Sequence, residues 1–242
     1  MMKTWAITDV GLVRKENQDA YRIARGGDVC VVCDGMGGAA GGQIASTLAA
    51  ETYAAELEKI LKPDMTPEQL REASSYAVAM ANQAVENRAT EDDELSNMGT
   101  TLVSAIAYEG GAVVTNVGDS RAYYITRAGI TRITKDHSLV ESMVDHGDIT
   151  ADEARHHPSR NLITRALGRD TNASCDGYIR PMDKGDYLLL CTDGLVNTVT
   201  DQEMLFEVLH GQDEDSCLHR LMEIAKSQGA PDNVTAVLMR ML

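Results

Sequence analysis

An uninterrupted apolar run leads directly into a carboxylate in the stretch Val29-Cys30-Val31-Val32-Cys33-Asp34-Gly35. A short run of this kind, rich in β-branched residues and followed by glycine, is typical of a strand that is buried on both faces. The carboxylate of Asp34 therefore leaves the core at a strand end. Because several strand ends meet at one edge of a sheet, this carboxylate can join others from distant parts of the chain.

Two further aspartates lie at the ends of apolar runs. The run that ends at Thr192 leads into Asp193, and Asp232 opens the last apolar run of the chain. Carboxylates that gather at one place repel one another unless a cation or a proton lies among them. Carboxylate, carbonyl and water oxygens favour Mg²⁺ or Mn²⁺ over zinc or copper. The pattern predicts a divalent-metal site that contains Asp34, Asp193 and Asp232.

Each of these aspartates also has a simpler explanation, because Asp-Gly is a common turn dipeptide. Asp119 follows another apolar strand, residues 112–117, and is a fourth candidate acid at the same sheet edge. A hairpin turn explains Asp119 equally well from the local sequence. Gly35 would allow its own backbone carbonyl to approach an ion closely. The metal site is therefore inferred from the aspartates together and from none of them alone.

The composition restricts the functions that this protein can have. Its 242 residues suit one large domain or two small ones, and 22 basic against 37 acidic residues give a formal charge of −15. This charge disfavours binding to nucleic acid and to anionic membranes. The sequence shows no membrane-spanning stretch and no signal-peptide pattern at its start. The five cysteines form no disulfide framework, so we expect a cytoplasmic protein.

The local sequence predicts closely spaced strands and a few helices with well-marked starts. Capping boxes, in which a threonine and a Glu or Gln three residues later satisfy the first backbone donors, begin at Thr66, Thr150 and Thr200. Further helices are expected at about residues 42–61 and 216–228, and strands at residues 100–108, 112–117, 121–126 and 130–134. Hairpin-length links between strands indicate mainly antiparallel sheets, and therefore an α+β layered fold.

A glycine-rich segment, residues 35–42, satisfies a loose dinucleotide-binding pattern and is expected to be a loop. Two features count against a nucleotide site. Asp34 would repel a pyrophosphate unless a cation lay between them, and the next helix leads into another long helix instead of a second parallel strand. The glycines more simply allow backbone to come close to a metal and a substrate. Arg14 suits a phosphate oxyanion, although from the local sequence a solvated surface arginine is the better explanation.

Six motifs occur in order along the whole chain: Arg14-x-x-Asn17-Gln18-Asp19, Asp34-Gly35-Met36-Gly37-Gly38, Met98-Gly99-Thr100-Thr101, Gly118-Asp119-Ser120-Arg121, Asp193-Gly194 and Asp232-Asn233-Val234-Thr235. Together they resemble the metal-dependent PPM protein phosphatases (type 2C) in their compact bacterial form. The resemblance implies a four-layer αββα sandwich, in which helix pairs flank two mainly antiparallel sheets. It also implies one catalytic domain over residues 1–242, with a flap subdomain at about residues 136–168.

The resemblance assigns a metal-binding role to five residues. Asp34 would bridge two Mn²⁺ or Mg²⁺ ions, and Gly35 would give its carbonyl to the second ion. Asp193 and Asp232 would complete the ligands of the first ion. Bacterial members of the family often bind a third ion, for which Asp119 and Asp193 are the matching positions.

The resemblance also assigns roles around the metals. Asp19 would hold a water molecule beside the ions, and Arg14 matches the arginine that binds the phosphate. The polar, His- and Arg-rich segment that begins with Asp136-His137-Ser138 matches the mobile flap that shapes access of protein substrates. The implied activity is hydrolysis of phosphoserine and phosphothreonine in proteins by a metal-activated water. The implied partners are phosphorylated proteins and a cognate bacterial Ser/Thr kinase, and we expect a monomer.

One position departs from the family pattern. Most members carry a histidine, thought to protonate the leaving alkoxide, where this chain has Ala39. The loss of a general acid could cost roughly 10²–10⁴-fold in rate. Water on the metal, or a flap histidine such as His137, His156 or His157, could donate the proton instead. The alternative function is a low-turnover or pseudo-phosphatase regulator that binds phosphoproteins.

Overall fold

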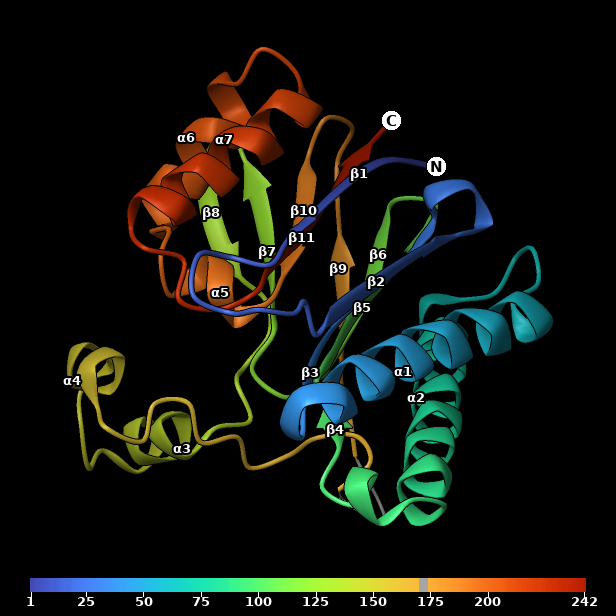
Figure 1. Ribbon diagram of the computed structural model, residues 1–242. Helices are drawn as coiled ribbons and strands as arrows, with labels where there is room; N and C mark the ends of the chain where they lie inside the picture. The colour runs from blue at the N-terminus through green and yellow to red at the C-terminus, as the bar shows by residue number, and fades with distance from the viewer. Residues whose placement is uncertain (170–173) are drawn as a thin grey trace.

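The computed structural model describes residues 1–169 and 174–242, except for the side chains of Ala39 and Arg155. Two antiparallel sheets face each other in it (Figure 1). The strands of the first sheet are, in spatial order, β1 (Met2–Asp9), β11 (Val234–Met241), β10 (Tyr187–Cys191), β7 (Arg121–Thr126) and β8 (Gly129–Arg132). The strands of the second sheet are β2 (Asp19–Ala24), β3 (Val29–Met36), β5 (Leu102–Tyr108), β6 (Gly111–Val117) and β9 (Asp176–Pro181), with β4 (Gly99–Thr100) paired to the end of β3.

Helix pairs cover the outer faces of both sheets (Figure 1). The second sheet is covered by α1 (Gly38–Ile60) and α2 (Pro67–Thr90), and the first by α6 (Asp201–His210) and α7 (Glu214–Ser227). The shorter elements are η1 (Arg25–Gly27), η2 (Asp93–Leu95), α3 (Leu139–His146), α4 (Ala151–His156) and α5 (Asp193–Val196). The predicted α+β sandwich of four layers is confirmed.

The apolar run in β3 fills two different core layers. Val29, Val31 and Cys33 pack under helices α1 and α2, whereas Cys30 and Val32 pack between the two sheets. Because both faces of the strand are covered, its apolar residues do not alternate with polar ones. Cys30 and Cys33 therefore point to opposite faces of the strand and cannot share a metal ion.

Several predicted element boundaries agree with the structure. All three capping boxes form, with the threonine side chain accepting from the backbone of the third helical residue in α2, α4 and α6. The predicted strand over residues 100–108 is divided between β4 and β5, because Thr101 turns its backbone N–H toward the carbonyl of Asp34. Local pattern therefore located the elements, and tertiary contacts set their ends.

The prediction of a loop over residues 35–42 is wrong except at Gly37, because strand β3 extends to Met36 and helix α1 begins at Gly38. The glycines there permit close packing. A Cβ atom on Gly42 would lie 2.6 Å from the side-chain oxygen Oε1 of Gln18. Gly37, with φ of 126°, makes the turn between β3 and the helix. The segment is the tightly packed start of a helix.

A segment with α3 and α4 projects from the sandwich (Figure 1). It lies within the predicted flap, residues 136–168, and its helices contact each other. No helix in the described part of the chain is long and apolar enough to cross a membrane.

Candidate metal centre

The sheet register brings the predicted acids to one edge of the sandwich. Asp34 lies near the end of β3, directly opposite Asp19 at the start of β2. Asp193 follows β10, and Asp232 precedes β11, which pairs with β10. Asp119 lies in the turn between β6 and β7. Because neighbouring strands are antiparallel, the end of one strand and the start of the next lie at the same edge. Acids that follow one strand and precede another therefore meet there.

Burial and mutual repulsion disfavour the charged forms of these acids. Burial, and then the charges of Asp19 and Asp193, raise the pKa of Asp34 well above its ordinary value. Burial and the charge of Asp193 raise the pKa of Asp119 to about 8. Burial and the nearby Asp232 likewise raise the pKa of Asp193. A group of carboxylates with these shifts favours a bound cation or proton.

Asp19 is the most buried of the five acids. Its oxygen Oδ2 accepts a hydrogen bond of 2.9 Å from the hydroxyl of Thr192, and that hydroxyl accepts in turn from the backbone N–H of Thr235. Burial is the largest cause that raises the pKa of Asp19 to about 7. Thr192 therefore fixes the orientation of Asp19 next to the metal acids.

The donor set fits a divalent cation. The Oδ1 atoms of Asp19 and Asp193 are buried and accept no hydrogen bond from the described part of the protein. Buried polar atoms normally have a partner, and a hard cation is a suitable one for a carboxylate oxygen. Within residues 1–169 and 174–242, however, no three carboxylate, imidazole or thiol groups already surround one point as ligands would. The acids are gathered at the edge, where Asp232 accepts from Arg14 at 2.7 Å and Asp193 accepts from Asn197 at 3.2 Å.

Gly35 is required by packing as well as by any role of its carbonyl. A Cβ atom at this position would lie 2.0 Å from the carbonyl oxygen of Gly42, at the start of α1. The backbone N–H of Gly35 donates to the carbonyl of Gln18 at 3.1 Å. The glycine therefore allows β2, β3 and α1 to meet beside Asp34.

Arg14 lies at the same edge, on the loop between β1 and β2. Its Nη2 atom is 2.7 Å from Oδ2 of Asp232, and about half of its side chain is exposed. The hydrogen bond to Asp232 is the largest cause that raises the pKa of Arg14, with smaller contributions from Asp34 and Asp193. The structure thus places this arginine beside the aspartates that are predicted to bind metal.

Threonines that hold Asp34 were not assigned a role from the sequence. The Thr101 hydroxyl accepts from the backbone N–H of Asp34 at 2.9 Å and lies 2.7 Å from the hydroxyl of Ser120, next to Asp119. The Thr100 hydroxyl donates to the carbonyl of Asp34 at 2.8 Å. Consecutive threonines at the end of a glycine-containing motif were the available signal, but only the fold shows that they fix Asp34.

The residues at the start of the predicted flap have structural roles. Asp136 is buried and accepts hydrogen bonds from Arg121 at 2.7, 3.0 and 3.1 Å, with Arg132 at 3.1 Å. Ser138 caps the N-terminus of α3 by accepting from the backbone of Glu141. The contacts of Asp136 with β7 and β8 fasten this segment to the first sheet. A part in substrate access stays a prediction for both residues.

His137 is also engaged by structural contacts. Its Nδ1 accepts from the backbone N–H of Gly118 at 3.0 Å, and its Nε2 lies 3.3 Å from Oδ2 of Asp176. Burial, followed by the charge of Arg165, lowers the pKa of His137. His156 and His157, the other suggested donors, lie at the end of α4, where each Nδ1 contacts nearby backbone.

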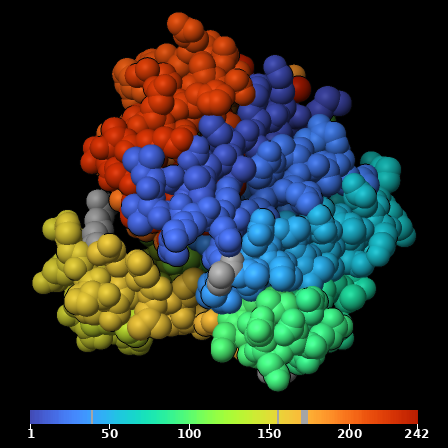
Figure 2. All heavy atoms as spheres, viewed as in Figure 1, coloured from blue at the N-terminus to red at the C-terminus, as the bar shows by residue number. Residues whose placement is uncertain are grey.

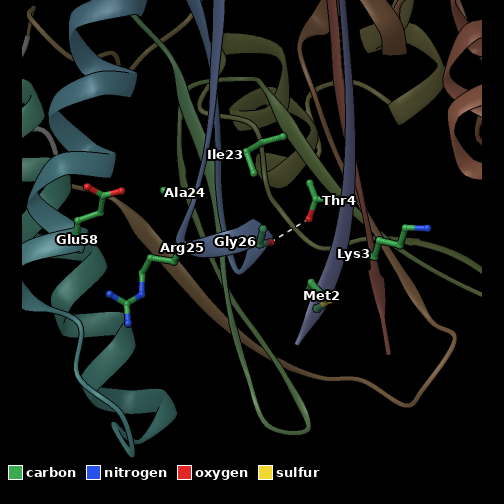
Figure 3. A pocket seen from close by; sticks show the side chains of 9 residues that line it. Met2, Lys3, Thr4, Ile23, Ala24, Arg25, Gly26 and Glu58 are labelled. Carbon is green, nitrogen blue, oxygen red and sulfur yellow. Dashed lines mark hydrogen bonds between the residues drawn. The ribbon is translucent and has the colours of Figure 1, made fainter.

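The side chain of Ala39, the position usually occupied by histidine, lies outside the described part of the structure. Figure 2 shows a recess between the N-terminal segment and the flap. A second hollow of about 440 Å³ lies at the far ends of β1 and β2, between Thr4, Arg25 and Glu58 (Figure 3). It is remote from the acids, because Asp9 and Asp19 are at the opposite ends of these strands.

An αββα sandwich with clustered aspartates at one edge defines a candidate metal-binding domain. The comparisons with known proteins give its family: residues 13–239 match the model for protein phosphatase 2C. The chain therefore belongs to the protein phosphatase 2C family.

Individual relatives agree with this family. The chain is 38% identical over 235 residues to the serine/threonine protein phosphatase PstP of Mycobacterium tuberculosis, covering 96% of this chain but 44% of PstP. It is 32% identical to the serine/threonine phosphatase stp of Listeria monocytogenes, covering 96% of this chain and 93% of the relative. A crystal structure of the PstP catalytic domain with two manganese ions has a TM-score of 0.86 and 33% identity, covering 99% of this chain and 97% of that chain.

Proposed function

We propose that this protein is a metal-dependent serine/threonine protein phosphatase that opposes a bacterial Ser/Thr kinase. The observation that carries the proposal is the group of five aspartates at one sheet edge with Arg14 beside it. Membership of the protein phosphatase 2C family supports the reaction. The two manganese ions in the PstP catalytic domain support the type of cofactor.

The aspartates would hold two Mn²⁺ or Mg²⁺ ions. Asp34 would contact both ions, Gly35 would offer its carbonyl to one, and Asp193 and Asp232 would bind the other. Asp119 and Asp193 would hold a third ion. When bound, such ions supply Lewis acidity and lower the pKa of water toward neutrality.

Arg14 and Asp19 would orient the reactants. Arg14 already donates to a carboxylate oxygen of Asp232, and a phosphoryl oxygen offers the same kind of acceptor. The loop that carries Arg14 is exposed at this edge, so a phosphorylated side chain can reach the guanidinium from solvent. Asp19, fixed by Thr192, has one oxygen left to accept a proton from an attacking water. No cysteine nucleophile is required.

The whole chain would act as one catalytic domain, in which residues 136–168 form the flap and Asp136, His137 and Ser138 fasten it. Phosphorylated proteins would enter between the flap and the N-terminal loop. We place this activity in the cytoplasm and in a monomer. The five cysteines are unpaired, as expected in a reducing compartment.

A low-turnover regulator that binds phosphoproteins is the second candidate, and Ala39 is the observation that favours it. Without an acid at that position, departure of a serine or threonine alkoxide is slow unless another group donates the proton. His137 is a weak replacement because both of its ring nitrogens are engaged. The two candidates differ in turnover and share the metal centre.

Hydrolysis of p-nitrophenyl phosphate in the presence of Mn²⁺ tests the proposal, because this leaving group departs without protonation. We expect hydrolysis with Mn²⁺ and none in EDTA, and the Asp193→Asn variant should lose it. Asp215→Asn, at an exposed aspartate on α7, is the matched control and should retain it. Hydrolysis in EDTA, or full activity of Asp193→Asn, would contradict the assignment. Turnover of a phosphothreonine peptide in the same assay separates the phosphatase from the regulator.

A further inference from the structure

Both polar atoms of the Asn233 side-chain amide form hydrogen bonds with the backbone of a single loop. It is almost completely buried at the start of β11, next to Asp232. Its Oδ1 atom accepts from the backbone N–H of Gln18 at 2.8 Å. Its Nδ2 atom donates to the carbonyl of Val10 at 2.9 Å and to the carbonyl of Glu16 at 2.9 Å.

These three partners enclose the loop that carries Arg14. Val10 stands where the chain leaves β1, and Glu16 and Gln18 stand just before β2 begins. The middle of the loop has little core of its own, because Leu12 is 62% and Val13 is 67% exposed. Bonds from outside the loop must therefore hold its shape.

Two further contacts place the same loop against the strand end that bears Asp232. The backbone N–H of Leu12 donates to the carbonyl of Ala230 at 2.9 Å. A Cβ atom on Gly11, whose φ is 79°, would lie 2.3 Å from the carbonyl oxygen of Asp232. The Arg14 loop and the residues around Asp232 thus form one packed unit, and Asn233 is the side chain at its centre.

We propose that Asn233 is a positioning residue that sets where the Arg14 guanidinium lies relative to the metal acids; this inference rests on the proposed phosphatase activity. Asn233 does not itself touch the substrate. It fixes both ends of a loop of nine residues, 10–18, and so determines how far Arg14 can move from Asp232. Small errors in the position of such a group are costly, because binding of the phosphoryl oxygens depends on aligned donors.

The chemistry of the three partners requires an amide. One partner is a donor and two are acceptors, and a side-chain amide offers one acceptor and two donors. Aspartate at position 233 would place an oxygen against two carbonyls, and alanine would leave three backbone groups of the loop without the partner that Asn233 gives them. The same partners fix which atom of Asn233 is oxygen and which is nitrogen.

A double-mutant cycle tests the inference. We expect Asn233→Ala to lower kcat/KM for a phosphothreonine peptide with Mn²⁺ by about tenfold, mainly through KM, and Arg14→Ala to lower it by more. If Asn233 acts through Arg14, the double variant will be no slower than Arg14→Ala alone. Multiplicative losses in the double variant would overturn the inference.

Two controls separate positioning from a general loss of stability or of metal. Tyr53→Phe removes a fully buried hydroxyl that contacts Ser74 and Ser104 in another layer, and it should lower the Tm without changing KM. The Mn²⁺ concentration for half-maximal activity should be unchanged in Asn233→Ala. A shift of this concentration by tenfold or more, with KM unchanged, would mean that Asn233 acts on Asp232, and would contradict the proposal.

Hydrogen exchange of the Mn²⁺-loaded full chain gives a readout that does not depend on turnover. We expect peptides that cover residues 10–18 to exchange faster in Asn233→Ala and in the nearly isosteric Asn233→Asp, with strands β3 and β10 unchanged. Unchanged exchange in this loop would overturn the inference even if the enzyme is active. If the wild type fails to hydrolyse p-nitrophenyl phosphate with Mn²⁺, the proposed function fails, whereas the exchange result still decides whether Asn233 holds the loop.

Discussion

The sheet edge that gathers the five aspartates and the start of the predicted flap differ in the surroundings of their aspartates, as Asp34 and Asp136 show. Asp136 accepts hydrogen bonds from Arg121 and pairs with Arg132, so its charge is compensated by its neighbours. Asp34 lies among Asp19, Asp119, Asp193 and Asp232, and its pKa is raised by burial and by their charges. A buried carboxylate with cationic neighbours fastens the fold, whereas one among other carboxylates is poised to bind a cation.

Replacing Asp34 should have the largest effect. It should lower the catalytic activity and raise the stability of the metal-free protein. We expect Asp34→Asn to lower Mn²⁺-dependent hydrolysis of p-nitrophenyl phosphate by about 10³-fold or more, since the central ligand is lost. The same change should raise the Tm of the metal-free protein, because it removes a repelled buried charge. Activity assays and thermal unfolding in EDTA measure the two effects. A lower Tm together with retained activity would show that Asp34 is structural.

Replacing Asp136 should have the opposite effect on stability. Asp136→Ala leaves the guanidinium group of Arg121 without its carboxylate and Arg132 with Glu141 alone, and we expect a loss of about 3 kcal/mol in the free energy of unfolding. Denaturant unfolding measures it. Asp145→Asn, which breaks the exposed pair with Lys135 on the same segment, is the control and should change stability by less than about 0.5 kcal/mol. Equal losses of unfolding free energy in Asp136→Ala and Asp145→Asn would contradict the claim that the buried pair stabilises the fold more than the exposed pair.

Introducing a histidine at position 39 tests whether the centre lacks only a proton donor for the leaving group. We expect Ala39→His to raise turnover of a phosphothreonine peptide by about 10²-fold, because an alkoxide needs a proton to leave. Hydrolysis of p-nitrophenyl phosphate should change by less than about threefold, since nitrophenolate leaves unprotonated. The ratio of the two rates is the measurement. An unchanged ratio would mean that the chain already has an adequate proton donor.

The smallest effect should be a pH dependence of stability in the absence of metal. The folded-state pKa values of Asp19, about 7, and Asp119, about 8, lie above the ordinary value of 3.8. Between pH 3.8 and about 8 the folded state therefore binds more protons than the unfolded state, and the free energy of unfolding falls as the pH rises through this window. In EDTA we expect a Tm lower by about 5 °C at pH 8 than at pH 5.5.

Two variants control this pH experiment. Asp19→Asn and Asp119→Asn should each flatten the dependence, because each removes one of the titrating groups. Addition of Mn²⁺ at pH 8 should raise the Tm, since the ion binds the folded state. A Tm that rises with pH in EDTA would contradict the assigned repulsion.

The sequence predicted the acid edge better than the flap, and the reason is physical. Asp34 and Asp193 follow apolar runs, so their place at strand ends could be inferred from the pattern alone. The partners of Asp136 and His137 come from strands and loops whose packing no local pattern reveals. The resemblance to a family indicated the flap, but the roles of its first residues as anchors became visible only in the structure.

The supporting residues of the site were hidden for the same reason. Asn233 contacts residues more than two hundred positions away in the sequence, and Thr101 reaches Asp34 across a separation of 67. Both lie in motifs that were recognised, yet nothing in the motifs states which backbone groups they would hold. The glycines after Asp34 were predicted to form a loop because glycine is common in loops. The close contact of Gly42 with Gln18 depends on tertiary packing, so the sequence could not reveal it.

The most direct test of the metal centre is an anomalous difference map from crystals of this protein grown with Mn²⁺. We expect two strong peaks at the sheet edge, one coordinated by Asp193 and Asp232 and both in contact with Asp34. Crystals of Asp34→Asn under the same conditions should lose these peaks while keeping the fold. Manganese peaks away from these aspartates, or no peak in wild-type crystals at millimolar Mn²⁺, would contradict this expectation.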